Sequence, residues 1–121
     1  MKTMLFAALA AGTVQAAAEP GPPTDAHFTS ARRAFDEQLL DHTSARFRDV
    51  HGDAGAVCGF VNAKNRMGAY TGWTRFVVLF TSPPRLEIEE AGKENIFVDV
   101  ICKEDDPRTT GPDYSDRLTH R

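Results

Sequence analysis

The sequence lacks the motifs that specify a reaction or a cofactor. It contains no Gly-x-Ser-x-Gly segment, no phosphate-binding glycine loop, no Cys-x-x-Cys pair and no internal repeat. Its four histidines are scattered along the chain, and none forms a pair at the spacing of metal ligands. Because no catalytic or metal-binding cluster is evident, we predict that the protein is not an enzyme and uses no metal or cofactor.

An excess of positive charge and a long apolar run are also missing. The chain carries 14 basic and 17 acidic residues, a formal net charge of −3 at pH 7. This balance gives no electrostatic reason to expect nucleic acid or an anionic membrane surface as a partner. The apolar run of residues 4–11 is far too short to cross a bilayer, so we predict no membrane span.

The N-terminus has the pattern of an export signal. Lys2 supplies the positive charge, residues 4–11 supply the apolar run, and small residues at 16–18 supply a cleavage site. We therefore predict a signal peptide over residues 1–18 and export to the periplasm or the medium. We expect a proline-rich linker over residues 19–25 and one folded domain over residues 26–103. Residues 104–121 are highly charged with few apolar residues, which predicts a flexible tail.

The chain has only two cysteines, Cys58 and Cys102. In an exported protein an even number of cysteines indicates a disulfide, so we predict a bridge between them. Two alternatives stay open. Cys58 could act as a nucleophile with His51 as its base, or a cysteine could share a metal site with a histidine.

Two hydrophobic periods divide the folded region. Phe28, Ala31, Phe35 and Leu39 recur every three or four residues, which predicts an amphipathic helix over residues 26–40. Beyond this helix the apolar residues recur at every second position, which is typical of strands. The expected strands cover residues 47–51, 56–61, 73–81, 85–89 and 96–102. The predicted fold is α+β, with one N-terminal amphipathic helix packed on a curved antiparallel sheet of four to five strands.

The strand predicted over residues 73–81 has apolar side chains on both faces, which is typical of a central strand covered on both sides. Arg75 on this strand is expected to pair with Asp99 of the last strand. In a simple meander, however, the strands that carry Cys58 and Cys102 are not neighbours. The disulfide therefore requires either a strand order that joins the first and last strands or a strongly curled sheet.

Two segments carry a resemblance to a known family. The segments LLDHTSARFRDV, residues 39–50, and VCGFVNAKNRMGAYTGWTRFVV, residues 57–78, resemble an uncharacterised family of small exported bacterial proteins. Members of that family share a Ser-Ala-x-Phe segment and a Cys-Gly-x-Val-Asn-x-Lys-Asn-x-x-Gly-x-Tyr-x-Gly block. This sequence departs from the pattern at His42, where a proline often follows the aspartate. The resemblance implies export and a recurrent fold, and it implies no activity.

Residues 62–73 connect two predicted strands and form the candidate binding loop. Asparagine and glycine tolerate positive φ angles, so a purely structural hairpin explains those residues of the loop. It does not explain the cationic and aromatic residues, which are typical of protein interfaces. The candidate binding residues are Asn62, Lys64, Asn65, Arg66, Tyr70 and Trp73. We predict a non-enzymatic exported module that binds an envelope protein or another cell-envelope ligand. The alternatives are a cysteine-dependent envelope hydrolase and a structural or assembly protein.

Overall fold

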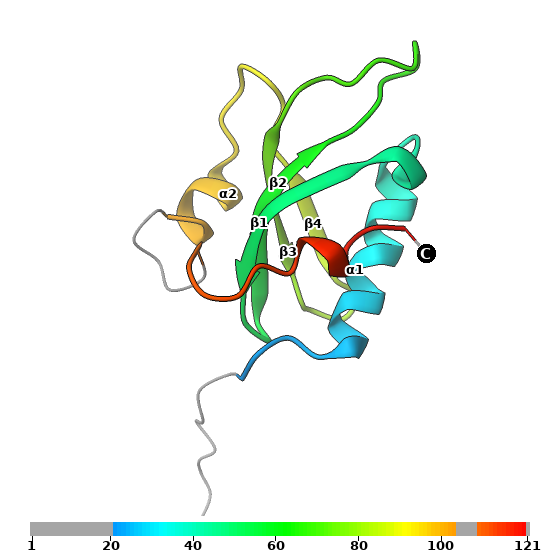
Figure 1. Ribbon diagram of the computed structural model, residues 1–121. Helices are drawn as coiled ribbons and strands as arrows, with labels where there is room; N and C mark the ends of the chain where they lie inside the picture. The colour runs from blue at the N-terminus through cyan, green and yellow to red at the C-terminus, as the bar shows by residue number, and fades with distance from the viewer. Residues whose placement is uncertain (1–20, 104–108, 121) are drawn as a thin grey trace, which may run out of the picture.

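The computed structural model describes residues 21–103 and 109–120. In chain order its elements are helix α1 (Asp25–Gln38), 3-10 helix η3 (His42–Ser44), strands β1 (Arg46–Gly52), β2 (Ala56–Asn62), β3 (Thr74–Leu79) and β4 (Arg85–Ile88), helix α2 (Ile96–Ile101) and 3-10 helix η5 (Ser115–Arg117) (Figure 1). The predicted signal peptide over residues 1–18 lies outside the described residues. So do residues 19–20 of the predicted linker and residues 104–108 and 121 of the predicted tail.

The four strands form one antiparallel sheet in the order β1-β2-β3-β4, so the chain follows a meander. The coarse α+β prediction, an antiparallel sheet combined with helices, is confirmed. Pairing is regular from β2 to β4, whereas the register of β1 shifts between Arg48 and His51. At this bulge Asp49 has a φ angle of 52°, in the left-handed region. The irregularity therefore lies in an edge strand, directly after Arg48.

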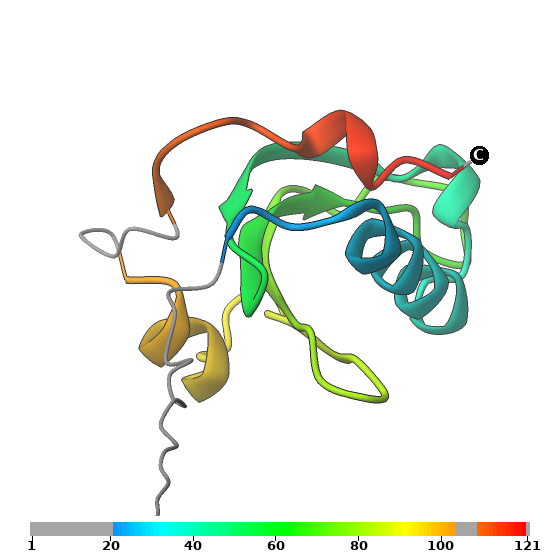
Figure 2. The ribbon, with the colours of Figure 1, turned by 90° about the horizontal axis from the view of Figure 1, so that it is seen from below.

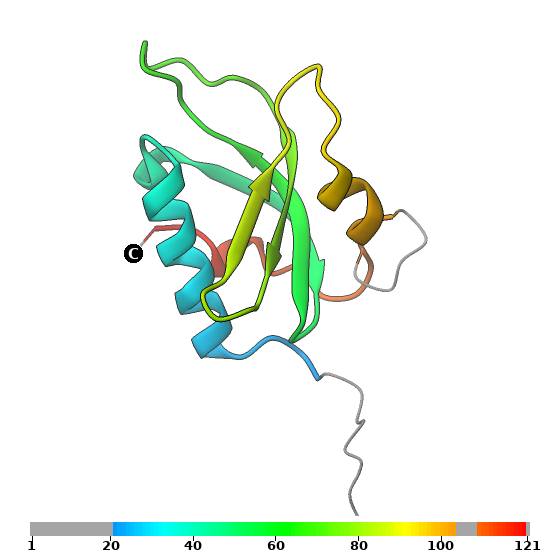
Figure 3. The same cartoon turned by 180° about the vertical axis from the view of Figure 1, so that it is seen from behind.

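Helix α1 covers one face of the sheet. It begins at a capping box in which Thr24 and His27 bond to each other's backbone N–H groups. Its buried residues include Phe28 and Phe35, and the Phe35 ring meets Phe76 of β3 edge-on, with ring centroids 5.1 Å apart. Burying one such ring contributes about 1.5–3 kcal/mol. The helix also runs beside β4 (Figure 3), where the Gln38 side chain donates to the carbonyl oxygen of Leu86 at 3.2 Å.

The strand predicted over residues 96–102 is wrong, because Ile96–Ile101 forms helix α2 on the opposite face of the sheet (Figure 2). Asn95 caps this helix, and its side-chain oxygen accepts hydrogen bonds from two backbone N–H groups. Val98 and Cys102, four residues apart, face the sheet, whereas Ile96 and Val100 are 71% and 58% exposed. The apolar residues thus follow a helical spacing, and the expected fifth strand does not exist.

Helix α2 explains how a meander accommodates the predicted disulfide. The helix lies over the sheet, so Cys102 approaches Cys58 of β2 from the face and not from a neighbouring strand. The Cys58–Cys102 bridge is present, with the two Cα atoms 5.9 Å apart. Arg75 Nη2 also lies 2.6 Å from Asp99 Oδ1, which confirms the predicted ion pair but places it between a strand and a helix.

The flexible tail predicted over residues 104–121 is also wrong for its described part, residues 109–120. Leu118 is fully buried in the core beneath α1, and the backbone N–H of Tyr114 donates to the carbonyl oxygen of Val50 in β1 at 2.7 Å. His42 is buried and its Nε2 lies 2.7 Å from the carbonyl oxygen of Leu118. Leu118, the Tyr114 ring packed against Phe28 and these polar contacts hold a segment whose composition is mostly polar.

Candidate functional site

The loop over residues 62–73 is a stiff hairpin that projects beyond the sheet (Figure 1). Lys64 and Tyr70 form a β-bridge across it. The Asn65 side-chain oxygen accepts hydrogen bonds from the backbone N–H groups of Met67 and Ala69 at 2.9 and 3.2 Å, and Gly68 has a φ angle of 81°. At the base, the Asn62 side chain accepts from the N–H of Gly72 at 2.9 Å. Two predicted binding residues, Asn62 and Asn65, therefore use their side-chain oxygens to hold the loop.

Tyr70 and Trp73 contact cationic side chains from the neighbouring strand. The Tyr70 hydroxyl donates to the carbonyl oxygen of Ser44 at 2.9 Å, which fixes the ring. Arg46 Cζ lies 4.2 Å from the centre of this ring, and Lys64 Nζ lies 5.4 Å from it. Arg48 Cζ lies 4.6 Å from the centre of the Trp73 ring and 5.1 Å from that of Phe60. Contacts of this kind are favourable by about 0.5–1 kcal/mol at exposed sites.

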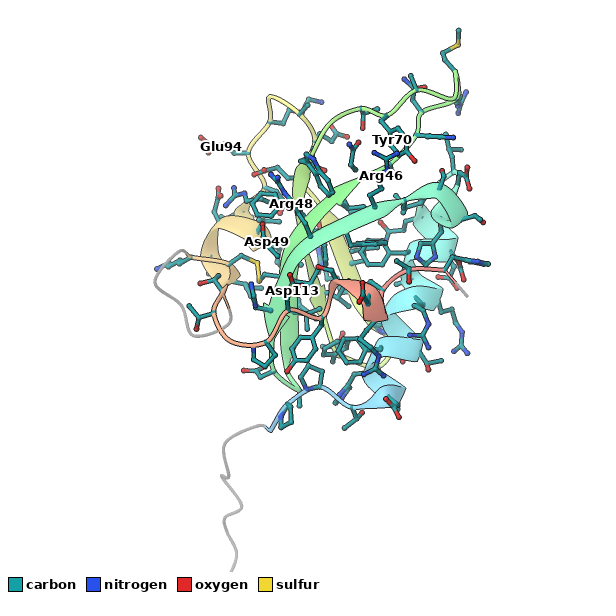
Figure 4. All side chains as sticks on the ribbon, viewed as in Figure 1. Arg46, Arg48, Asp49, Tyr70, Glu94 and Asp113 are labelled. Atoms are coloured by element: carbon teal, nitrogen blue, oxygen red, sulfur yellow. A yellow bond between two sulfur atoms is a disulfide. The ribbon has the colours of Figure 1, made fainter. Side chains whose placement is uncertain are left out.

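These residues form two neighbouring clusters, one around Tyr70 and one around Arg48, which together are called the cation–aromatic surface. It consists of Arg46, Arg48, Phe60, Lys64, Tyr70 and Trp73. Figure 4 shows Tyr70 beside Arg46 at the base of the hairpin, with Arg48 and then Asp49 following along β1. Sequence reasoning identified the three hairpin residues but missed the two arginines and Phe60. The signal that could have found them is Arg-x-Arg alternation, because it places both arginines on the same face of β1, opposite Asn62 and Phe60 of β2.

The hairpin tip is exposed and makes few contacts. Met67 at the tip is 88% exposed, whereas Trp73 at the base, in contact with Arg48, is 38% exposed. Arg66, another predicted binding residue, is also exposed. Within residues 21–103 and 109–120 it has no hydrogen bond, ion pair or ring contact. The structure therefore gathers Lys64, Tyr70 and Trp73 with the β1 arginines, and leaves Arg66 at the tip beside Met67.

A depression of about 400 Å³ adjoins the lower end of this surface. Its lining includes Asp49, His51, Phe60, Arg75 and the Cys58–Cys102 bridge. His51 pairs with Cys58 in the β1–β2 register, but its Nδ1 lies 2.8 Å from the carbonyl oxygen of Pro112. The sulfur of Cys58 is bonded to Cys102 and is not a free thiol. The nucleophile of the predicted alternative hydrolase is therefore not available in this oxidised form.

Arg75 at the edge of the depression has a structural role. It donates to Glu89 at 2.5 Å and to Asp99 at 2.6 Å. The Glu89 carboxylate, assisted by that of Asp99, holds the pKa of Arg75 above its ordinary value. Its charge is thus balanced by two carboxylates within the protein.

Two other kinds of site, a metal centre and a membrane-spanning helix, are absent from the part of the chain that the structure describes. No group of three or more His, Cys, Asp or Glu residues there is placed to hold a metal ion. No helix in the same residues is both long and apolar enough to pass through a membrane. No family model, curated protein or solved structure matches this chain.

Proposed function

We propose that the protein is an exported, non-enzymatic binding module that holds a protein or cell-envelope ligand through the 62–73 hairpin and strand β1. The observation that carries this proposal is the cation–aromatic surface. Tyrosine, tryptophan and arginine contribute most of the binding energy at protein interfaces. Binding residues also reside commonly on loops that a rigid sheet supports. Here the hydrogen bonds of Asn62, Asn65 and Tyr70 hold the loop before any ligand arrives, which lowers the entropy cost of binding.

Export is part of this proposal. Residues 1–18 have the pattern of a signal peptide, and a disulfide persists mainly in oxidising compartments. Mass spectrometry of the protein recovered from periplasm or medium tests both points together. A mass that corresponds to loss of residues 1–18 and of two hydrogens supports export. Recovery of the full-length chain with two free thiols inside cells contradicts it.

The binding role is tested with a variant that removes the hairpin's predicted contact groups, Arg66→Ala/Tyr70→Ala/Trp73→Ala. The immobilised variant should no longer retain the component that the wild-type protein retains from an envelope extract. Its thermal midpoint should stay within a few degrees of wild type, because these side chains lie outside both clusters of buried residues. The matched control is Arg33→Ala/Lys93→Ala, which removes exposed cations from α1 and from the turn before α2.

The outcome of this comparison is decisive in either direction. Equal retention by the hairpin variant and by wild type would refute a binding role for the hairpin. Unfolding of the hairpin variant would show that the hairpin stabilises the fold, which also contradicts the proposal. Tyr70→Phe separates the two effects, because it keeps the ring under Arg46 and removes only the hydrogen bond to Ser44.

A further inference from the structure

We infer that the ligand of the cation–aromatic surface is an acidic, extended stretch of polypeptide whose carboxylates are bound by Arg46 and Arg48. This inference rests on the proposed function and names the chemistry of its ligand. Its starting point is the state of these two guanidinium groups. The Arg46 guanidinium is held on Tyr70, and that of Arg48 is held on Trp73 and Phe60. The rings contact the planar groups and leave their N–H donors to solvent.

The other arginines of the sheet, of α1 and of η5 are mostly paired within the protein. Their partners are the carbonyl oxygen of Arg117 for Arg32, Glu89 and Asp99 for Arg75, Glu87 for Arg85, and Asp25 for Arg117. The Arg46 guanidinium has no hydrogen-bonding or ion-pair partner among the residues that the structure describes. For Arg48 the nearest carboxylate oxygen, that of exposed Asp49, is 3.8 Å from Nε, which is beyond hydrogen-bonding distance.

This distribution is selective. The chain has more acidic than basic residues, 17 against 14. A surplus of carboxylates would be expected to neutralise most exposed arginines, as it does around Arg75. Arg85 and Arg117 also stack on aromatic rings, but each has a carboxylate partner in addition. Arg46 has the ring contact without a carboxylate partner among the described residues.

The cation–aromatic surface carries three cations, Arg46, Arg48 and Lys64, against two neighbouring carboxylates, Asp49 beside Arg48 and Asp41 near Lys64. It therefore keeps a surplus of positive charge on an acidic protein, which attracts an acidic partner.

The spacing of the two arginines favours an extended peptide. Arg46 and Arg48 are alternate residues on one face of β1, so their Cα atoms are about 7 Å apart. Carboxylates at alternate positions of an extended acidic peptide have the same repeat of about 7 Å. Each planar guanidinium can bind a carboxylate through two parallel hydrogen bonds. A long nucleic acid fits less well, because the net negative charge of the protein repels it outside this surface.

Trp73 provides the readout, because it is the one tryptophan in the chain and part of the surface itself. Wild-type protein is titrated with poly-L-glutamate at low ionic strength while Trp73 fluorescence is followed. A saturable change is expected, and it should weaken as salt is added. Arg46→Ala/Arg48→Ala should reduce the affinity by about tenfold or more, since it removes two charge-assisted contacts. Arg33→Ala removes an exposed arginine elsewhere and should leave the affinity unchanged.

The controls separate the chemical class of the ligand from a general attraction to polyanions. Heparin and vesicles containing phosphatidylglycerol are titrated in parallel. Equal or stronger binding of either, with the same dependence on Arg46 and Arg48, overturns the assignment of an acidic polypeptide. If the alanine double variant does not fold, Arg46→Gln/Arg48→Gln replaces it, because glutamine keeps a long polar side chain without the charge.

The result is also distinguishable from failure of the proposed function. If poly-L-glutamate gives no arginine-dependent signal while envelope capture still depends on the hairpin, the acidic-peptide inference is wrong and the binding module stands. If capture is also independent of the hairpin, both proposals fail.

Discussion

Removing the disulfide with Cys58→Ala/Cys102→Ala should lower the free energy of unfolding by about 4 kcal/mol. The bridge joins residues separated by 44 positions. The chain-entropy treatment assigns about 4 kcal/mol to a loop of this length. A small domain has only about 5–15 kcal/mol of stability, so this loss is a large share of the total. At about 4–8 °C per kcal/mol, the thermal midpoint should fall by roughly 15–30 °C.

The loss should be greatest around α2. A helix of six residues is too short to be stable alone, so α2 depends on the bridge, on buried Val98 and on the ion pair between Arg75 and Asp99. The amide of Cys102, which donates to the carbonyl oxygen of Val98 at 2.8 Å, should exchange with solvent early in the variant. The amide of Val77, in central strand β3, should stay protected longest.

Urea unfolding gives the free energy, and hydrogen exchange followed by NMR gives its distribution along the chain. Two controls accompany the variant: reduced wild-type protein, which should lose a similar amount, and Lys103→Ala, an exposed change beside Cys102 that should have little effect. An unfolding midpoint equal to that of wild type would refute the reasoning. So would simultaneous loss of protection at Cys102 and Val77, because it would mean that α2 and the sheet open as one unit.

Three further changes test the packing and the C-terminal segment. Gly59→Ala should destabilise the protein by about 1–3 kcal/mol in urea unfolding, because the added Cβ would lie 2.7 Å from Val50 Cγ2 and 3.1 Å from the Phe76 ring. Gly21→Ala is the comparison, because a Cβ there meets no atom within 4 Å and the backbone does not adopt a positive φ angle. His42→Ala should lower the free energy of unfolding by about 2–3 kcal/mol in the same assay. The side chain of buried His42 has Nδ1 at 2.6 Å from Asp36 and Nε2 at 2.7 Å from the carbonyl oxygen of Leu118. Thr43→Ala, an exposed change beside it, should lower the free energy of unfolding little. Hydrogen bonds from the Ser115 side chain, and then from backbone N–H groups, lower the pKa of Asp113. The stability that ionised Asp113 contributes is therefore present above the ordinary carboxyl pKa, and it is lost as the pH falls through the lowered pKa. Acidification should therefore lower the protection factor of the Tyr114 amide in wild type, measured against the intrinsic exchange rate at each pH, and Asp113→Asn should remove this acid dependence.

The strands of the meander were predictable because their signal is local. In β3, Phe76 and Val78 face α1 whereas Val77 faces α2, as alternation requires. Helix α2 was not predictable in the same way. Its residues are mostly β-branched and also satisfy an alternating pattern, so only the packing of Val98 against the sheet shows which period applies.

The C-terminal segment and the full binding surface depend on contacts between distant residues. Leu118 is a single apolar residue in a charged segment, and nothing nearby in sequence indicates that it enters the core. Tyr70 and Trp73 could be selected from composition, since aromatic and cationic residues are concentrated in the hairpin. Arg46 and Arg48 join them only through the pairing of β1 with β2, which sequence spacing does not determine.

Photo-crosslinking from the hairpin tip in cells that export the protein tests the central claim most directly. A crosslinking amino acid replaces Met67, which is 88% exposed, or Arg33 on the surface of α1 in a matched strain. A discrete adduct with an envelope protein from position 67, absent from position 33 and lost in the Arg46→Ala/Arg48→Ala background, is the predicted result. The same adducts from both positions, or none from position 67 in folded, exported protein, would contradict the claim that this surface binds the partner.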